Sequence, residues 1–344
     1  MPNQVRNLVS AVLFTGILLV PGARSQTAKR PRLVGISQIV VRAHDLAESR
    51  RFYGELLGFE EAITIRKDQT AVPGGGLPAS QVSSVFFKVN NRQYIVVMPE
   101  RSAEEGRFVR YAVETDDAEA MRLHLKALGY AVPGNTARTA TGDIAFQLAD
   151  ADGNVIEVMQ YTPTSLSVQG AGKYLSGDRL AQRIIHAGFG ISKPESVKLY
   201  LEGFAVREFW RADSTMRAPG AVPPNQKAPA GPLLATLSNL KLPESDDYIE
   251  WSFLRTLPAA TPGGSRRGPG HIALETPYNM EKTIAAVKAR AAFKMYKQEY
   301  ESHVGINHKW QGNFFDPDGT RTEFMEHDSA DGVPSPMSGA PYFQ

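Results

Sequence analysis

The chain carries one short pattern twice, and this repetition limits its fold more than any other feature. The pattern is Asp-x-Asp-Gly, followed four residues after the glycine by a glutamate inside an apolar run. One copy occupies residues 146–160 around Glu157, and the other occupies residues 314–327 around Glu323. Asp-Gly before an apolar run predicts a turn that leads into a strand. The sequence therefore places a carboxylate in the middle of two predicted strands.

Each copy closes a longer unit, and the first unit opens at residues 35–62. Asp45 is a predicted helix cap, and Gly58 stops the helix that follows it. The predicted elements of this unit are strands near 36–41, 60–65, 84–89 and 93–98 and a helix at 46–57. The order is strand, helix and three strands.

Three further units repeat this order, which makes an internal repeat the main guide to the fold. They open at residues 107–132, 183–210 and 269–290. In the second unit Asp116 aligns with Asp45, and Gly129 with Gly58. The Ser- and Gly-rich stretch 162–182 lies between units two and three and marks the predicted domain boundary. Two long Pro- and Gly-rich loops, 67–80 and 213–245, are either binding loops or surface insertions without a role.

Composition and the first residues indicate where the protein is located and which partners it binds. The 344 residues include 38 Lys+Arg and 36 Asp+Glu with no block of one sign, which disfavours nucleic acid as a partner. Residues 1–25 are typical of a signal peptide, so we expect an exported protein, periplasmic or secreted, with no membrane association after cleavage. An uncleaved anchor is the alternative. Because the chain has no cysteine, any metal must be held by His, Asp or Glu.

Four predicted strands carry a lone His or Glu on the face opposite their apolar residues. In unit three, for example, Ile185 and Ala187 face one side and His186 faces the other. If these strands line one concave sheet, the four side chains converge. A divalent cation would offset the cost of burying two carboxylates there, and Zn, Ni, Mn, Fe or Co suits the donors. The four residues are His186, Glu250, His271 and Glu323.

The first half of the chain differs at the same four positions. They are Gln38, Val96, Val109 and Glu157. Because two of them cannot bind a metal, we predict a structural copy with a degenerate site. Glu157 is then a carboxylate at a polar cavity or one paired with a cation.

Over residues 34–328 the chain resembles the vicinal oxygen chelate superfamily, which includes glyoxalase I, extradiol dioxygenases and bleomycin-resistance proteins. The segments that carry the resemblance are ISQIVVRAHDLAESRRFYGELLGFE, DADGNVIEV, HIALETP and DPDGTRTEF. The resemblance implies an α+β fold with four βαβββ modules. They pair into two glyoxalase-like domains with curved, half-open barrel sheets, at residues 34–161 and 184–328. A flexible tail follows at 329–344.

The resemblance also implies a chemistry. The family's metal ligands lie on the first and last strands of each module, which are the positions of His186, Glu250, His271 and Glu323. A His-Glu-His-Glu set resembles the glyoxalase and isomerase branch, in which the metal is a Lewis acid on a small substrate with two adjacent oxygens. Glu323 would be both ligand and base there, with Glu250 opposite. The oligomeric state and the substrate are not named by the sequence.

Two other functions stay open. The four-unit layout also resembles the extradiol dioxygenases, whose two His and one Glu would be His186, His271 and Glu323, with iron as the metal. A metal-free protein that sequesters a small molecule in its groove is the third alternative. The tryptophans Trp210, Trp251 and Trp310 would suit such a groove, although core packing explains Trp251 at least as well.

Overall fold

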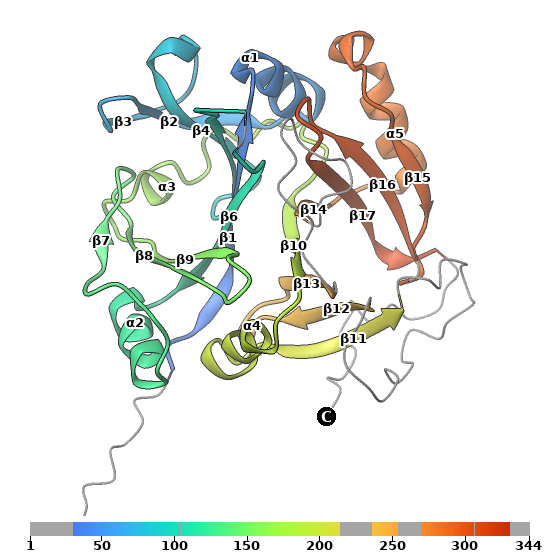
Figure 1. Cartoon of the computed structure of the whole chain (residues 1–344). Helices are drawn as coiled ribbons and strands as arrows, with labels where there is room; N and C mark the ends of the chain where they lie inside the picture. The colour runs from blue at the N-terminus through green and yellow to red at the C-terminus, as the bar shows by residue number, and fades with distance from the viewer. Residues whose placement is uncertain (1–29, 104, 214–235, 254–269, 306, 331–344) are drawn as a thin grey trace, which may run out of the picture.

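Two curved sheets stand side by side in the computed structural model, one from residues 33–160 and the other from residues 183–329 (Figure 1). The structure describes residues 30–103, 105–213, 236–253, 270–305 and 307–330. The predicted signal peptide and the predicted tail from residue 331 onward lie outside these ranges. None of the described helices has the length and apolar character needed to cross a membrane.

Units one and two form the first sheet. Its strands are β1 (Leu33–Ala43), β2 (Glu60–Arg66), β3 (Ala71–Pro73), β4 (Val82–Lys88), β5 (Tyr94–Pro99), β6 (Phe108–Thr115), β7 (Ala137–Arg138), β8 (Ile144–Ala149) and β9 (Val155–Gln160). Their order across the sheet is β3-β2-β4-β5-β1-β6-β9-β8-β7. Because β1 and β6 pair antiparallel, the two units join through their first strands.

Units three and four form the second sheet in the same way. Its strands are β10 (Arg183–Ile191), β11 (Arg207–Asp213), β12 (Thr236–Lys241), β13 (Tyr248–Phe253), β14 (His271–Glu275), β15 (Glu301–Val304), β16 (Lys309–Phe315) and β17 (Arg321–Ser329). The order is β11-β12-β13-β10-β14-β17-β16-β15, with β10 and β14 antiparallel at the centre. The fold of four strand–helix–three-strand units paired into two sheets agrees with the prediction.

Each unit places its helix after its first strand. The helical segments are α1 (Leu46–Ser49), the π-helix η1 (Arg50–Leu56), the 3-10 turn η2 (Ala79–Gln81), α2 (Ala118–Ala127), α3 (Leu166–Gln169), α4 (Pro194–Lys198), the π-helix η3 (Leu199–Gly203), α5 (Met280–Ala289) and the 3-10 turn η4 (Ala291–Met295). Gly58 ends the first helix with φ +83°, a conformation that glycine adopts without a steric penalty.

The helix caps follow the prediction in unit one but not in unit two. Asp45 accepts a hydrogen bond from the Ala47 N–H at 2.7 Å. In unit two the cap is Asp117, which accepts from the Ala120 N–H at 2.9 Å, and not Asp116. Asp116 instead accepts from the Arg32 N–H. Two adjacent aspartates make the cap ambiguous in the sequence, and the start of the helix decides between them.

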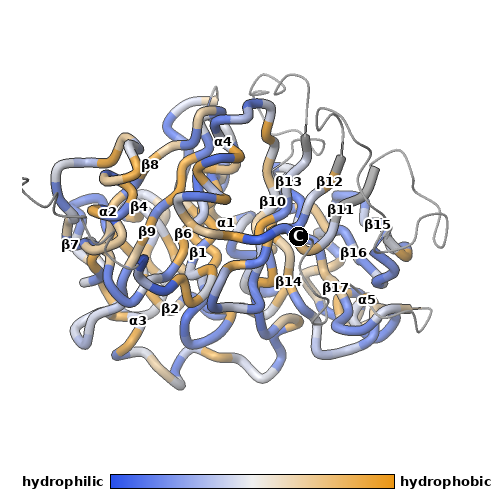
Figure 2. The backbone as a smooth tube through the Cα atoms, turned by 90° about the horizontal axis from the view of Figure 1, so that it is seen from below, coloured by the Kyte–Doolittle hydropathy of each residue, from blue (hydrophilic) through white to orange (hydrophobic). Residues whose placement is uncertain are grey.

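One hydrophobic core is shared by both sheets. It includes Ile39 and Tyr111 from the first sheet and Phe189 and Phe324 from the second. The rings of Tyr111 and Phe189 stack with centroids 5.2 Å apart. Apolar stretches follow β1, β6 and β9, whereas much of the connecting chain is hydrophilic (Figure 2). The apolar faces of the two sheets bury one another, whereas the opposite faces combine smaller apolar clusters with polar groups.

The first copy of the repeated pattern connects the two sheets. Asp150 accepts from backbone N–H groups two and four residues further on, which closes the turn, and from the Tyr200 hydroxyl at 3.1 Å. Asp152 accepts from the Ser192 N–H and from the Ser196 hydroxyl at 3.0 and 2.7 Å. The turn that ends unit two therefore binds the start of the helix of unit three.

The second copy makes the reciprocal connection. Asp316 accepts from the N–H groups of residues 318 and 320, and also from the Tyr53 hydroxyl at 2.9 Å. Asp318 accepts from the His44 N–H at 3.0 Å and lies 3.5 Å from the Arg107 guanidinium. The turn that ends unit four thus binds the helix of unit one. The repeated Asp-x-Asp-Gly joins the two halves of the molecule.

The stretch between units two and three is an ordered part of the first domain. Leu166, in α3, packs with Tyr174 against Val40 and Val96 on the concave face of the first sheet. Lys88 donates from Nζ to the backbone oxygens of Gly170 and Lys173. Figure 1 shows α3 inside the curve of that sheet. The predicted linker therefore fills the first domain's groove.

Candidate metal centre

Four strands at the centre of the second sheet bring the four predicted residues together. Gly188, on β10, pairs with Glu250 on β13 and with His271 on β14. Ala273, two residues after His271, pairs with Glu323 on β17. Because neighbours in register share a face, these side chains project from the face opposite the shared core.

The ring nitrogens and carboxylate oxygens of this cluster are close together. The Nε2 atoms of His186 and His271 lie 2.9 Å apart. Glu323 Oε2 is 3.5 Å from the first and 3.6 Å from the second. Glu250 Oε1 is 3.5 Å from His271 Nε2, and its Oε2 is 3.9 Å from His186 Nε2. The ligand atoms of His186, Glu250 and His271 all lie within 4.8 Å of one another.

This donor set fits one divalent ion. Zinc–nitrogen and zinc–oxygen bonds are about 2.0–2.2 Å, so tetrahedral ligands are roughly 3.4 Å apart and ligands at right angles roughly 3 Å apart. Four of the five contacts above, at 2.9 to 3.6 Å, lie close to these values, and the contact of His186 with Glu250 is longer at 3.9 Å. In the described part of the chain Nδ1 of His186 is buried without a hydrogen-bond partner, so Nε2, which faces the cluster, makes the polar contacts of this ring. Glu323 is a candidate fourth ligand beside His186, Glu250 and His271, because its Oε2 is almost equally far from the two histidines.

Gly188 makes room for one of the ligands. A Cβ atom built on Gly188 would lie 1.8 Å from Cε1 and 2.2 Å from Nδ1 of His271. The imidazole therefore lies directly over the backbone of β10. In the first sheet the corresponding residue is Val40, which leaves no such space.

A β-bulge changes one predicted face. The register between β10 and β14 shifts between Ile184 and His186. As a result Ile184 joins the shared core, whereas Ile185 packs with Tyr248 and Met325 in a cluster on the other side. The prediction that Ile185 shares the apolar face with Ala187 is wrong, because a bulge interrupts strict alternation.

The two glutamates differ in their electrostatic setting. Burial raises the pKa of Glu250 above its ordinary value; His186 opposes the rise and Glu323 adds to it. Burial also acts on Glu323, but Arg321 and the two histidines outweigh it and hold the pKa of Glu323 well below its usual range. Two carboxyl groups whose pKa values are pushed apart in one site are typical of functional centres.

In the first domain an ion pair lies at the place that corresponds to the cluster of the second domain. Val40 on β1 lies opposite Val96 and Arg110, as Gly188 lies opposite Glu250 and His271. The residue that corresponds to His271 is therefore Arg110, and the prediction of Val109 is wrong by one position. The sequence itself contains the correct alignment, because residues 110–115 (RYAVET) match residues 271–276 (HIALET) position by position.

Arg110 and a glutamine are the polar partners of the Glu157 carboxylate. Arg110 Nε lies 3.3 Å from Glu157 Oε2, and the Gln147 amide donates to Glu157 Oε1 at 2.8 Å. Glu157 is thus paired with a cation, as one of the two predictions for it states. Within the described ranges the one cluster of three His, Asp or Glu residues that could hold an ion is in the second sheet.

The remaining histidines lie away from this cluster. His308 directly precedes β16 and is buried. His44 and His303 are exposed. His327 is exposed and lies 3.3 Å from Glu275. His124, on α2, is half-buried.

The tryptophans divide among three environments. Trp251 lies in the shared core, as expected from its strand face. Trp210 packs with Phe209 and Tyr248 on the other side of the second sheet. Trp310 is 39% exposed. They do not form one aromatic groove.

Sequence reasoning missed several polar neighbours of the cluster. Arg321 and Tyr248 each lie two residues before a site glutamate, so the period of a strand could have identified them. Asn239 pairs in register with Glu250, and Asn313 with Glu323. Both asparagines are buried. Their positions depend on strand pairing, for which the sequence offers no signal.

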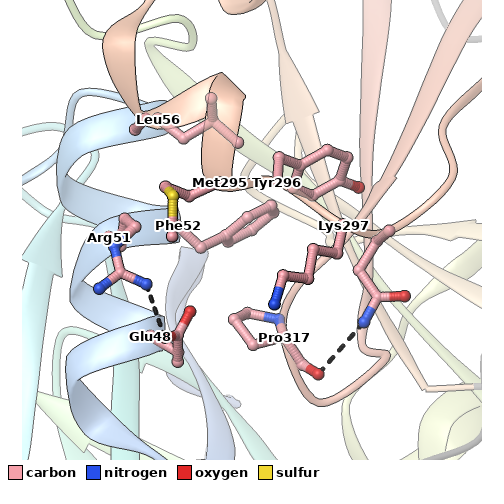
Figure 3. A pocket seen from close by; sticks show the side chains of 10 residues that line it. Glu48, Arg51, Phe52, Leu56, Met295, Tyr296, Lys297 and Pro317 are labelled. Carbon is pink, nitrogen blue, oxygen red and sulfur yellow. Dashed lines mark hydrogen bonds and ion pairs between the residues drawn. The ribbon is translucent and has the colours of Figure 1, made fainter.

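A separate pocket lies where the two domains meet. It has a volume of about 280 Å³ and lies between η1 and η4. Phe52 and Tyr296 line it, with Glu48, Arg51 and Lys297 among the charged groups around it (Figure 3). None of its lining residues belongs to the metal cluster, so the pocket contributes nothing to that chemistry.

One family model matches part of the chain. Residues 35–158 match the model of the Glyoxalase/Bleomycin resistance protein/Dioxygenase superfamily. The first domain is thus similar to that superfamily. No curated protein matches the sequence significantly. The family match covers the domain whose site is degenerate, and the cluster itself lies in the domain beyond it.

Solved structures share the fold of nearly the whole chain. The Mn(II)-bound glyoxalase from Novosphingobium aromaticivorans has a TM-score of 0.56 at 16% identity, covering 89% of this chain and 84% of that one. An extradiol ring-cleaving dioxygenase from B. fuscum has a TM-score of 0.58 at 14% identity, with 89% and 76% covered. The 2,3-dioxygenase LapB from Pseudomonas sp. KL28 has 0.55 at 15%, with 91% and 95% covered. At these identities the likeness establishes the fold.

Proposed function

We propose that the protein is a metal-dependent enzyme of the glyoxalase, isomerase or epimerase type that acts on a small molecule with two adjacent oxygens. The single observation that carries this is the convergence of two imidazole and two carboxylate groups on one point of the second sheet. Nε2 of each histidine lies within 3.6 Å of a Glu323 oxygen and within 3.9 Å of a Glu250 oxygen. One divalent ion, of Zn, Ni, Mn, Fe or Co, would be held by all four residues.

The chain's own residues would bind the substrate and move a proton. A bound divalent cation would supply Lewis-acid polarisation of two adjacent substrate oxygens. Glu323 would accept a proton from the carbon next to the polarised carbonyl and return it to the neighbouring carbon, and Glu250 would face the substrate from the other side. Both glutamates are held by β-strands at the centre of a sheet, which fixes their positions for proton transfer.

The fourth ligand separates this proposal from ring-cleaving oxygen chemistry. An extradiol-type iron centre needs two histidines and one carboxylate, which His186, His271 and Glu323 would supply. Glu250 would then be surplus. Its Oε1 lies 3.5 Å from His271 Nε2, as near as the Glu323 oxygen, which favours a role as ligand. A metal-free binder is also disfavoured, because the one nearby guanidinium, that of Arg321, offsets only one of the two carboxylate charges.

Metal analysis of protein purified without chelators tests the proposal. We expect about one divalent ion per wild-type chain and a loss of at least tenfold in affinity in Glu250→Ala, because one of four ligands is removed. Glu157→Ala, in the first domain, is the matched control and should keep its metal. Unchanged iron in Glu250→Ala with oxygen consumption on catechols would support the dioxygenase instead. No metal in the wild type would contradict both.

We also propose that the protein is exported. The support is the order of a basic residue, a short apolar run and small residues before Ser25. Mass spectrometry of the native protein should give a chain that begins at Gln26. A chain that retains Met1 in the cytosol would contradict export.

A further inference from the structure

The metal cluster has a cationic neighbour that the proposed proton transfer does not use. Arg321 is the first residue of β17, two residues before Glu323, and it pairs in register with His271. Its Nη2 lies 3.9 Å from an oxygen of Glu250 and 3.9 Å from an oxygen of Glu323. Its side chain is 30% exposed. The guanidinium therefore lies between the buried ligands and the solvent.

The contacts of Arg321 with the glutamates are too long to be hydrogen bonds of its guanidinium. A hydrogen bond from N–H to oxygen is about 2.7–3.2 Å, so neither 3.9 Å contact qualifies. A guanidinium has five N–H donors arranged to bind a carboxylate through two of them at once. Within the described ranges no hydrogen bond joins this guanidinium to a side chain of the cluster. Donors remain for a group that enters from solvent.

The charge balance of the centre indicates which charge a group bound by Arg321 would carry. Two glutamates and one divalent ion sum to zero, and the neutral histidines add nothing. Arg321 then leaves the centre with a net positive charge in a buried setting, where electrostatic interactions are stronger than in water. A substrate with a carboxylate would neutralise this charge, and a neutral substrate would not.

Comparison with the first domain argues against a purely structural role for Arg321. There the glutamate also has an arginine, but Arg110 holds the position of His271 and contacts Glu157 directly at 3.3 Å. The residue that corresponds to Arg321 in that domain is Val155. In the first domain the counter-ion of the glutamate is therefore at the position that His271 has in the second domain. Arg321 lies outside that position, at the edge of the cluster.

A buried amide adds a second polar contact on the same face. Asn313, on β16, pairs in register with Glu323 and is 3% exposed. Its Oδ1 is buried and has no hydrogen-bond partner in the described part of the chain. A buried amide without a partner is costly, and a hydroxyl group of a bound substrate would satisfy it.

We infer that Arg321 selects a substrate that carries a carboxylate next to its pair of adjacent oxygens. This rests on the proposed function, because the metal must bind the two oxygens. The substrate class is therefore a small organic acid with a chelating oxygen pair. Arg321 is a specificity-determining residue, and Asn313 assists it through the substrate hydroxyl.

Two probes that differ only in charge test the inference. The Zn²⁺-loaded protein is titrated by calorimetry with 3,4-dihydroxybenzoate and with 3,4-dihydroxybenzamide. We expect the wild type to bind the acid about tenfold or more tightly than the amide, the range of a charge-assisted bidentate contact. In Arg321→Gln the ratio of acid affinity to amide affinity should fall to about twofold or less, and Arg321→Lys should retain part of the preference. Arg101→Gln, on the surface of the first domain, is the control.

The outcomes separate this inference from the proposed function. Equal binding of acid and amide by the wild type, an acid preference that survives in Arg321→Gln, or binding of neither probe overturns the inference. In each of these cases a zinc content of one per chain leaves the metal proposal standing. A wild-type chain that takes up no zinc overturns the proposed function first, and the inference with it.

Discussion

Single residues decide whether this fold holds a metal. Both domains share strand order and register, yet one has a His-Glu cluster and the other an Arg110–Glu157 ion pair. Gly188 contributes as much as the ligands, since the His271 ring occupies the space of a Cβ. Alternation along the strands predicted that the four His and Glu side chains would converge. The need for glycine could not be predicted, because it depends on a neighbouring strand.

Gly188→Ala should disrupt the centre while leaving the fold intact. The new Cβ would lie 1.8 Å from the His271 ring, so the imidazole must turn away. We expect the affinity for a divalent metal to fall at least tenfold, as for loss of a ligand. Competition with a chromophoric chelator measures it. Gly134→Ala is the control, because nothing lies within 4 Å of a Cβ there. Wild-type affinity in Gly188→Ala would contradict the placement of His271.

At the scale of secondary-structure elements, the two Asp-x-Asp-Gly turns join the two domains. The repeat predicted the strand–helix–three-strand units and the closing strands. It did not predict that each Asp-x-Asp-Gly turn binds a helix of the other domain, because those partners are remote in sequence. The sequence predicted only a domain boundary at residues 162–182, and the structure adds that Leu166 and Tyr174 of this stretch pack into the groove of the first sheet.

Asp152→Ala tests the first of these turns. The change removes hydrogen bonds to the Ser192 N–H, the Lys193 N–H and the Ser196 hydroxyl. We expect a loss of about 2–3 kcal/mol in the free energy of unfolding, since bonds to a charged group are the stronger ones. Urea denaturation measures it. Asp116→Ala, which removes one exposed hydrogen bond, should cost less than about 1 kcal/mol. Equal stability of the two variants would be the contrary result.

At the scale of the whole molecule, buried carboxyl groups lie where the domains meet. Asp247, in the second domain, accepts from the Ile36 N–H at 2.9 Å and from the Gln93 amide at 3.1 Å, both in the first. Burial raises the pKa of Asp247 to about 7, although Arg183 opposes the shift. Burial likewise raises the pKa of Asp316 to about 7 at the other contact. Length and repetition predicted two domains, but not this extensive polar contact between them.

These groups predict how stability depends on pH. A carboxyl group whose folded pKa is about 7 and whose ordinary value is 3.8 binds its proton more tightly in the native state. The native state is therefore favoured at low pH, and each group lowers the free energy of unfolding as pH rises from about 4 to 7, by up to about 1.4 kcal/mol per pH unit. Asp247→Asn should flatten this slope in denaturation curves recorded from pH 5 to 8. An unchanged slope would contradict the burial of a titrating Asp247.

We propose that four side chains from the second sheet hold a single ion. Anomalous diffraction at the manganese edge, from crystals of wild-type protein loaded with Mn²⁺, tests this directly. We expect one strong peak at bonding distance from Nε2 of His186, Nε2 of His271 and an oxygen of each of Glu250 and Glu323. A peak elsewhere, or an ion at this place with either glutamate turned away from it, would contradict the proposal.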